Sequence, residues 1–363
     1  MWCTPERSMN HSAVSLALCG LVPIVASGRA SQQAEKAGEK AQGGLWISSE
    51  EIQQLPTRGE SWRALCAAAE NPLPAPDLSE RDNNCDVLCL AKALVHVRAG
   101  EARYADEVRT AIEAAIGTER RGDVLSLARN LPGYVISAEL VGLPPALEKR
   151  FRSWLELVPN EELEGMTLRG VHEKRPNNWG THAGAARVVV ARYLGRTQEV
   201  ERVAQIFRGW LGERDSYAGF QFGELDWQAD PTHPVGINPA GAVREGHSID
   251  GVLPDDQRRS GGFSWPPPKE NYVYEALQGA LLQAMVLSRA GYDVWEWGDR
   301  ALLRAFQWLE REAQFPAEGD DTWQPHVIDH VYGTSLRLET PARPGKSVGW
   351  TDWTLTAGHL RER

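Results

Sequence analysis

Side chains that could hold an anion or move a proton occur in three separate stretches of this sequence. The first contains Asn178, the second Arg259 and the third Tyr272. An amide and a guanidinium donate hydrogen bonds to a carboxylate, and a phenol can take a proton when a cation lowers its ordinary pKa of about 10. Each residue also has a structural interpretation, as part of a helix cap, a solvated charge or a packing aromatic. Only their joint order favours chemistry.

Helices must position these side chains, because apolar residues recur at helical spacing along most of the chain. Val87, Leu90, Leu94 and Val97 mark one such helix. The sequence predicts helices over residues 86–98, 104–116, 123–141, 146–158, 178–194, 197–211, 271–289 and 299–312.

Local signals refine this prediction. Pro132 is expected to bend the helix over 123–141, and Thr197 can cap the helix that follows it. Residues 212–268 are rich in Gly, Pro and Asp, and their apolar residues follow no sustained helical period. A loop of this length within a domain is usually functional. The chain after Phe315 is also rich in loop residues.

These elements predict an all-α fold. The helical part shows no strand alternation, and successive helices of similar length suggest pairs. We expect residues 46–363 to form a single domain, an incomplete (α/α) toroid or barrel with long irregular loops at the end that carries the active site. A chain of 363 residues is within range of such a fold.

The bulk composition excludes some partners. A formal net charge of −10 argues against nucleic acid, whose binders carry basic surfaces. No segment approaches ~20 continuous apolar residues, so no membrane span is expected. A locally basic cleft could still hold an anionic polymer. We expect a monomer without a cofactor.

The first 30 residues resemble an export signal. Arg7 precedes an apolar stretch from Ala13 to Ala26, and cleavage after Ala26 or Ala30 would fit the small residues there. Residues 31–45 are polar and are predicted to be a flexible linker. The mature protein is therefore expected in the periplasm or outside the cell.

Three cysteines would remain after cleavage: Cys66, Cys85 and Cys89. An oxidising compartment permits one disulfide and leaves one thiol over, and the sequence does not choose between the pairings. Cys85 and Cys89 are one helical turn apart, but the second ligand pair of a zinc site is missing. No metal site is expected.

Three motifs follow one another in a distinctive order. They are RPNNWGTH at 175–182, DGVLP at 250–254 followed by Arg258 and Arg259, and YVYEALQ at 272–278 in a helix that ends at GYDVW, 291–295. Together they resemble the alginate lyase superfamily of polysaccharide lyases, over roughly residues 85–310, and the resemblance implies an (α/α) toroid. Trp179 stands where that family has a histidine after its asparagine pair, as in a divergent subgroup.

The resemblance implies a lyase that cleaves a uronate-containing polysaccharide, alginate-like or glucuronan-like, by β-elimination. Such an enzyme removes the C5 proton of a uronate and expels the 4-linked oxygen. Asn178 corresponds to the family's amide that neutralises the carboxylate, and Arg259 to its arginine. The family's tyrosine, which acts as base, acid or both, corresponds best to Tyr272, with Tyr274 as the rival.

Two residues are candidates for the missing histidine. His182 lies four residues after Asn178 and would share a helix face with it, whereas His247 lies in the irregular region before Asp250. Further residues could form the basic and aromatic lining that a polyanion requires: His172, Lys174, Arg175, Asn177, Trp179, Arg244, Arg258, Trp265, Lys269 and Trp323.

Two other functions compete with the lyase. An inverting glycoside hydrolase would need two carboxylates ~6.5–9.5 Å apart, and Glu245, Asp250, Asp255 and Asp256 could supply them. A non-catalytic protein that binds acidic polysaccharide would keep the fold without the chemistry. Elimination leaves an unsaturated uronate that absorbs ultraviolet light, which separates the lyase from both.

Overall fold

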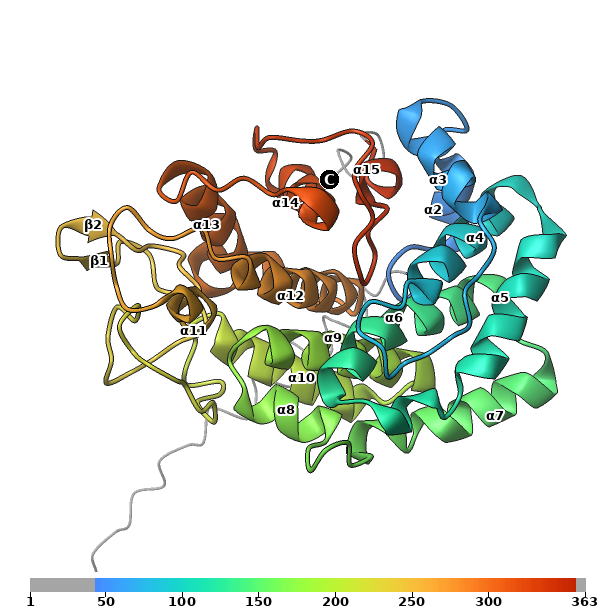
Figure 1. The fold of residues 1–363 in the computed structure, drawn as a ribbon, viewed down its shortest axis with the longest axis horizontal. Coiled ribbons are helices and arrows are strands. Elements are labelled where there is room, and N and C mark those ends of the chain that lie inside the picture. The colour runs from blue at the N-terminus through green and yellow to red at the C-terminus, as the bar shows by residue number, and fades with distance from the viewer. Residues whose placement is uncertain (1–42, 357–363) are drawn as a thin grey trace, which may run out of the picture.

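The computed structural model describes residues 43–356, in which helices form a curved wall around a central axis (Figure 1). The first half contains α2 (Ser49–Gln54), α3 (Glu60–Glu70), α4 (Cys85–Ala99), α5 (Ala102–Ala115), η1 (Thr118–Arg121), α6 (Val124–Val141), α7 (Pro145–Leu155), η2 (Val158–Asn160), α8 (Leu168–Lys174), α9 (Asn178–Leu194) and α10 (Thr197–Trp210). The second half contains α11 (Pro254–Gln257), η3 (Arg258–Ser260), α12 (Tyr272–Arg289), η4 (Val294–Glu296), α13 (Trp297–Arg311), η5 (Gly319–Asp321), α14 (Gln324–Tyr332) and α15 (Thr351–Thr354). Strands β1 (Val243–Arg244) and β2 (His247–Ser248) pair antiparallel.

The wall has an inner and an outer layer, and burial separates them. Almost every residue of α6, α9 and α12 is buried, as expected for helices that are apolar or small on all sides. The outer helices α5, α7, α10 and α13 bury one face each and expose the other. The predicted all-α, incomplete toroid is therefore confirmed.

Helices α9 and α12 pack very closely because glycines lie between them. A Cβ atom on Gly279 would lie 2.5 Å from the backbone nitrogen of His182, and one on Gly184 would lie 2.3 Å from Oε1 of Gln283. Contacts near the start of α9 fall near the start of α12, and those further along fall further along. The two helices therefore run in the same direction and begin at the same end of the wall.

The C-terminal segment closes the open side of the wall. Nζ of Lys346 lies 2.8 Å from Oδ1 of Asp86 on α4 and 2.6 Å from Oδ1 of Asn130 on α6. The indole of Trp353 donates to the carbonyl of Pro56 at 2.9 Å. Figure 1 shows α15 between α14 and the first helices of the chain.

The predicted helices are present, with ends that differ by a few residues. Pro132 lies within α6, which continues through it. The prediction that Thr197 caps a helix is wrong, because Thr197 is the first residue of α10 and no side chain caps that end. No helix range was predicted for α2, α3, α8, α14 or α15. Region 212–268 is irregular as expected, apart from the hairpin, α11 and η3.

The N-terminal predictions are largely outside the described residues. The signal peptide over 1–30 and most of the linker over 31–45 lie there. The linker prediction is wrong for its last residue, because Leu45 is buried and its N–H donates to Oε2 of Glu139 at 2.8 Å. No helix within residues 43–356 has the length and apolar character needed to cross a bilayer.

Candidate functional site

Two side-chain oxygens, one from an amide and one from a carboxylate, accept backbone N–H groups at the start of α9. Oδ1 of Asn177 accepts the N–H of Trp179 at 3.2 Å, so Asn177, predicted to bind substrate, acts as the N-cap of α9. The N–H of Asn178 donates to Oδ1 of Asp256 at 3.0 Å. Asp256 belongs to α11, so this bond holds the segment around residue 256 against the first turn of α9.

The same segment reaches the start of α12 through Arg259. The guanidinium carbon of Arg259 lies 3.7 Å from the ring centroid of Tyr272, which is 40% exposed. Consecutive contacts thus run from Asn178 to Asp256, along three residues to Arg259, and on to Tyr272. The structure therefore brings the three stretches that carry these residues together at one end of the wall.

Tyr274, the rival phenol, lies in the core. It is 1% exposed, and its hydroxyl donates to the carbonyl of Phe315 at 2.7 Å. Burial raises the pKa of Tyr274 far above its ordinary value. Of the two candidate tyrosines, Tyr272 is therefore the one whose hydroxyl can meet a ligand.

One helical turn after Tyr272, Glu275 of α12 forms an ion pair with Arg129 of α6 on the inner layer of the wall. Nη1 of Arg129 on α6 lies 2.9 Å from Oε2 of Glu275, and Nε2 of His182 lies 3.7 Å from the same oxygen. Burial raises the pKa of Glu275, but His182 and the charge of Arg129 outweigh it and lower that pKa overall. Burial lowers the pKa of His182, so its imidazole is neutral at pH 7.

Several polar atoms of this inner wall have no hydrogen-bond partner among residues 43–356. They are Oδ1 of Asn178, both ring nitrogens of His182 and Oε1 of Gln278. A buried polar atom without a partner costs about 1–3 kcal/mol, so such atoms are rare and often belong to sites that bind water or a ligand. Here they come from the first two turns of α9 and α12.

Asp321 adds an acid to the same wall. Its Oδ1 accepts from Nε2 of Gln278 at 2.8 Å and from Nε2 of Gln324 at 2.6 Å. Burial raises the pKa of Asp321 to about 7. Asp321 and Glu275 are therefore two carboxyl groups whose surroundings move their pKa values in opposite directions.

His247, the other candidate histidine, lies on the hairpin of the irregular region. Its ring stacks on Trp265, with centroids 4.3 Å apart. On the neighbouring strand, Arg244 lies 5.5 Å from the ring of Phe263, and its Nη1 donates to the carbonyl of Gln228 at 3.3 Å. These predicted ligands form an outer rim, whereas His182 belongs to the inner wall.

Other residues predicted to bind substrate have different surroundings. Trp323 is completely buried and packs in the core, so the prediction that it lines the cleft is wrong. Arg258 is paired with Glu224 and, at 2.9 Å, with Asp255. Lys174 and Lys269 are exposed.

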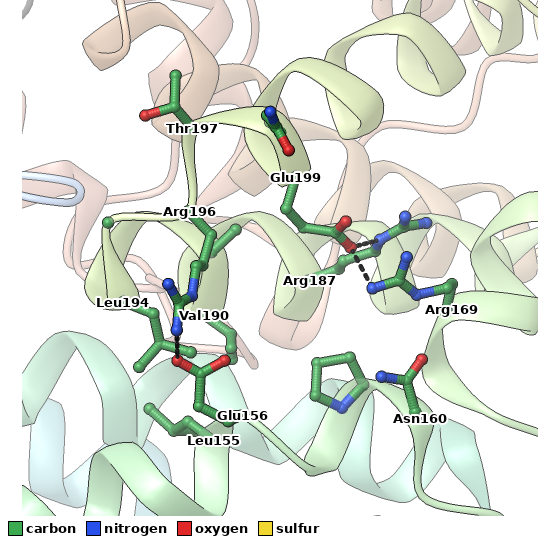
Figure 2. Close-up of a pocket in the computed structure, with 14 residues that line it drawn as sticks. Leu155, Glu156, Asn160, Arg169, Arg187, Val190, Leu194, Arg196, Thr197 and Glu199 are labelled. Atoms are coloured by element: carbon green, nitrogen blue, oxygen red, sulfur yellow. Dashed lines mark hydrogen bonds and ion pairs between the residues drawn. The ribbon is translucent and has the colours of Figure 1, made fainter.

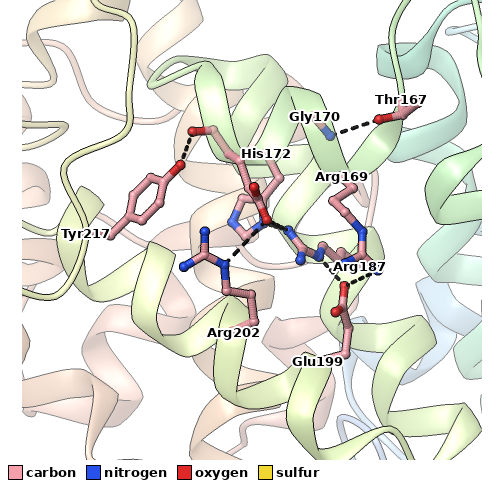
Figure 3. A network of polar contacts seen from close by, with 9 residues as sticks. Thr167, Arg169, Gly170, His172, Arg187, Glu199, Arg202 and Tyr217 are labelled. Carbon is pink, nitrogen blue, oxygen red and sulfur yellow. Dashed lines mark hydrogen bonds and ion pairs between the residues drawn. The ribbon is translucent and has the colours of Figure 1, made fainter.

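His172 was also predicted to face substrate, but it is buried in an ionic network behind α9 (Figure 3). Its Nδ1 accepts from Nη1 of Arg187 at 3.3 Å. Burial and this guanidinium lower the pKa of His172 well below its usual value. Glu173 and Glu199 balance the charge of Arg187, so the network joins α8, α9 and α10.

A cavity of 460 Å³ lies at the opposite end of α9, where Leu194 and Gly195 line it (Figure 2). Its guanidinium groups are engaged by acids, since Glu199 bridges Arg169 and Arg187 while Glu156 pairs with Arg196. Asn178 and His182, which the sequence predicts to be catalytic, lie near the other end of α9.

The four acids predicted for a hydrolase are mostly engaged by the backbone or by arginines. Asp250 pairs with Arg304 at 2.5 Å, and Asp255 pairs with Arg258. Asp256 is buried, which raises its pKa well above the ordinary value, and it holds Asn178 as described. Glu245 is exposed at a turn with a φ of 51°.

The three cysteines among residues 43–356 are free thiols. Sγ of Cys85 and Sγ of Cys89 are 3.9 Å apart and both residues are buried, while Cys66 is partly buried. Within residues 43–356, no group of His, Cys, Asp and Glu side chains is arranged to hold a metal ion.

Comparison with known proteins gives a likeness in structure and none in sequence. No family model matches the chain, and a search of curated proteins finds no match either. Among solved structures, alginate lyase A1-III from Sphingomonas species A1 is similar, with 12% sequence identity and a TM-score of 0.46. The match covers 88% of this chain and 93% of that chain.

The sequence patterns did not predict the charged residues that lie one turn further along the inner wall: Glu275, Arg129 and Asp321. Glu275 lies in the YVYEALQ motif, three residues after Tyr272, and helical spacing places the two on one face. That spacing was a usable signal. Arg129 and Asp321 gave none, because each reaches the site only through the packing of α6 or η5 against α12.

Proposed function

We propose that this chain is a polysaccharide lyase that cleaves a uronate-containing polymer by β-elimination. The proposal is carried by one observation: the backbone N–H of Asn178 bonds Asp256, three residues before Arg259, and Arg259 lies over the ring of Tyr272. An amide, a guanidinium and an exposed phenol are the groups that this reaction needs. Their motifs also occur in the order typical of the alginate lyase superfamily.

The first step is neutralisation of the substrate carboxylate. The side chains of Asn178 and Arg259 donate hydrogen bonds to it, which stabilises the enolate-like charge that forms when C5 loses its proton. The cap of α9 and Asp256 fix the backbone from which the Asn178 side chain extends, so this part of the site is ordered before the substrate binds.

The second step is transfer of the C5 proton to Tyr272. The guanidinium of Arg259 over its ring places a positive charge beside the group that accepts this proton. The electron pair of the C5–H bond forms a C4=C5 double bond, and the C4–O bond breaks. The departing oxygen takes a proton, and protonated Tyr272 is our candidate donor.

The test is incubation with a panel of uronate polymers, with ultraviolet absorbance as the readout for the unsaturated product. We expect Tyr272→Phe to lower the rate by about 10²- to 10⁴-fold, because it loses the group that transfers the proton. Tyr274→Phe is the matched control, since it removes the same hydroxyl from a buried position and should retain activity. A wild-type protein that produces no absorbance with any uronate polymer would refute the proposal.

A second candidate is a glycoside hydrolase that uses Glu275 and Asp321. It is favoured by their opposite pKa shifts, which are typical of a base and an acid that work as a pair. This activity would release new reducing ends without ultraviolet absorbance. Glu275→Gln would then abolish it, whereas Tyr272→Phe would not.

The predicted signal peptide would place such a lyase in the periplasm or outside the cell, where polymeric substrate is found. N-terminal sequencing of the mature protein should begin after Ala26 or Ala30. A mature protein that retains residues 1–30 would contradict this location.

A further inference from the structure

The C-terminal segment reaches the candidate site through Lys346. Its ammonium nitrogen lies 2.6 Å from Oδ1 of Asn130 on α6. The preceding residue, Arg129, forms the ion pair with Glu275, which lies one helical turn after Tyr272. The segment is therefore connected to the candidate phenol through one ion pair of the inner wall.

This segment is attached on both sides of the wall's open side. Residues 345–350 are all buried. Just before them, the N–H of Arg343 donates to Oγ1 of Thr322, at the end of η5, at 2.9 Å. Toward the other side, Lys346 bonds Asp86 of α4 at 2.8 Å, and Figure 1 shows the chain that leads into α15 between α14 and α4. A polymer that ran from the start of α12 over α6 to α4 would meet this segment.

The chain before α4 lies on the same side and adds to the obstruction. The guanidinium carbon of Arg81 lies 5.6 Å from the ring centroid of Trp179, the second residue of α9, and that of Arg175 lies 4.6 Å from it. Two residues after Arg81, the carbonyl of Asn83 accepts from Lys346. The C-terminal segment and the chain before α4 are therefore joined to each other beside the start of α9.

The opposite direction, toward the irregular region, is accessible to solvent. Tyr272 is 40% exposed. The loop that leads to it carries Trp265, which stacks on His247 of the hairpin, and both rings are partly exposed. A long ligand can therefore extend from Tyr272 toward this rim.

We infer that the lyase is exolytic: a uronate polymer enters from the rim with one chain end against residues 345–350, and Tyr272 acts near that end. The ammonium group of Lys346 is already bonded to Asp86 and Asn130, so the segment ends the binding site instead of adding a cation for a further carboxylate. This inference rests on the proposed lyase function and specifies which part of the polymer is cleaved.

The experiment follows the wild type on a uronate polymer with which it forms unsaturated product. Size-exclusion chromatography from the earliest times should show one short product, and the viscosity should fall slowly. Chains about ten times shorter contain about ten times more ends at equal mass, so below saturation the rate should rise about tenfold.

A double variant tests whether the segment is the obstruction. Asp86→Asn with Lys346→Gly removes the anchor on α4 and α6 without leaving a buried charge unpaired. We expect it to release products of many sizes and to lower the viscosity steeply at early times. Arg343→Gln is the control, because it alters an exposed side chain of the same segment, paired only with exposed Glu339 at 3.7 Å, and should release the wild-type product.

Two outcomes would overturn the inference and leave the lyase function standing. The first is a wild type that forms a ladder of product sizes from the start, at a rate that does not depend on chain length. The second is a folded double variant that still releases one product size, because another element would then stop the polymer. Thermal unfolding shows whether the double variant is folded, and if it is not, the wild-type product sizes decide. A wild type that forms no unsaturated product from any uronate polymer would instead refute the proposed function.

Discussion

At the scale of single residues, the surroundings of two acids of the inner wall move their pKa values in opposite directions. Burial raises the pKa of Glu275, but His182 and the charge of Arg129 lower it overall, whereas Asp321 accepts only from uncharged amides and burial raises its pKa to about 7. The difference lies in the partners that other helices supply. A guanidinium compensates for the desolvation of a carboxylate, but two amides do so only in part.

The raised pKa of Asp321 makes folding stability depend on pH. The unfolded chain loses this proton near the ordinary value of 3.8, but the folded chain keeps it until about pH 7. Stability should therefore fall as the pH rises from about 4 to 7 and then level off. Asp321→Asn, which still accepts from both glutamines, should remove this dependence and raise stability at pH 7 by about 4 kcal/mol.

Urea denaturation of both proteins at several pH values measures this effect. Asp106→Asn, which alters an exposed acid on α5, serves as the control. Parallel pH profiles for wild type and Asp321→Asn would show that Asp321 does not titrate as described.

Which of these residues could be predicted depends on where their partners lie in the sequence. Asn178, Arg259 and Tyr272 lie in motifs with recognisable order, so the sequence predicts them as a group. Burial in the folded protein excludes Tyr274 and Trp323 from the residues that can contact a ligand and leaves Tyr272. The pattern of residues along a single helix does not reveal this burial. Asp321 acquires its partners only when η5 packs against α12.

At the scale of elements, the close contact of α9 and α12 sets the position of the site. Gly279 allows the backbone of α9 to approach, and this fixes His182 against Glu275 one turn below Tyr272. The long helices were predictable from their period of 3.6 residues. The seven residues of α8 and the nine of α14, with Pro325 in the latter, are too short for that period to emerge.

Gly279→Ala tests this contact. The added Cβ would lie 2.5 Å from the backbone nitrogen of His182, so the helices must separate. We expect a loss of about 1–3 kcal/mol in the free energy of unfolding, because overpacking forces backbone shifts. We also expect a lower rate, since Asn178 and Tyr272 would move apart.

The control is Gly43→Ala, where no atom lies closer than 3.9 Å to the added carbon. Chemical denaturation gives the stability of each variant, and absorbance gives its rate. If Gly279→Ala matched the control in both, the contact between α9 and α12 would have no role in the geometry of the site.

At the scale of the whole molecule, the wall depends on its last segment. Lys346 is the counter-charge of Asp86, which is 1% exposed and whose pKa burial raises despite this partner. Arg289 likewise pairs with Glu51 near the start of the described chain. The sequence predicted helix pairs and a toroid, but no local pattern connects residues so far apart, and the closure was not predicted.

Lys346→Met tests the closure. It leaves Asp86 buried without its counter-charge, so we expect a loss of about 3–5 kcal/mol in the free energy of unfolding. The double variant Asp86→Asn, Lys346→Met removes both charges and should recover most of that loss. Equilibrium denaturation measures each, and a single variant as stable as the wild type would show that this pair does not stabilise the wall.

The pairing of Asp86 with Lys346 also bears on how the protein is made. The two residues are 260 positions apart, so α4 leaves the ribosome long before its counter-charge has been synthesised. Until then the nascent chain has a carboxylate that would be costly to desolvate, which keeps the early helices loosely associated. Assembly must therefore finish after synthesis, and refolding from denaturant should be slow because this contact spans most of the chain.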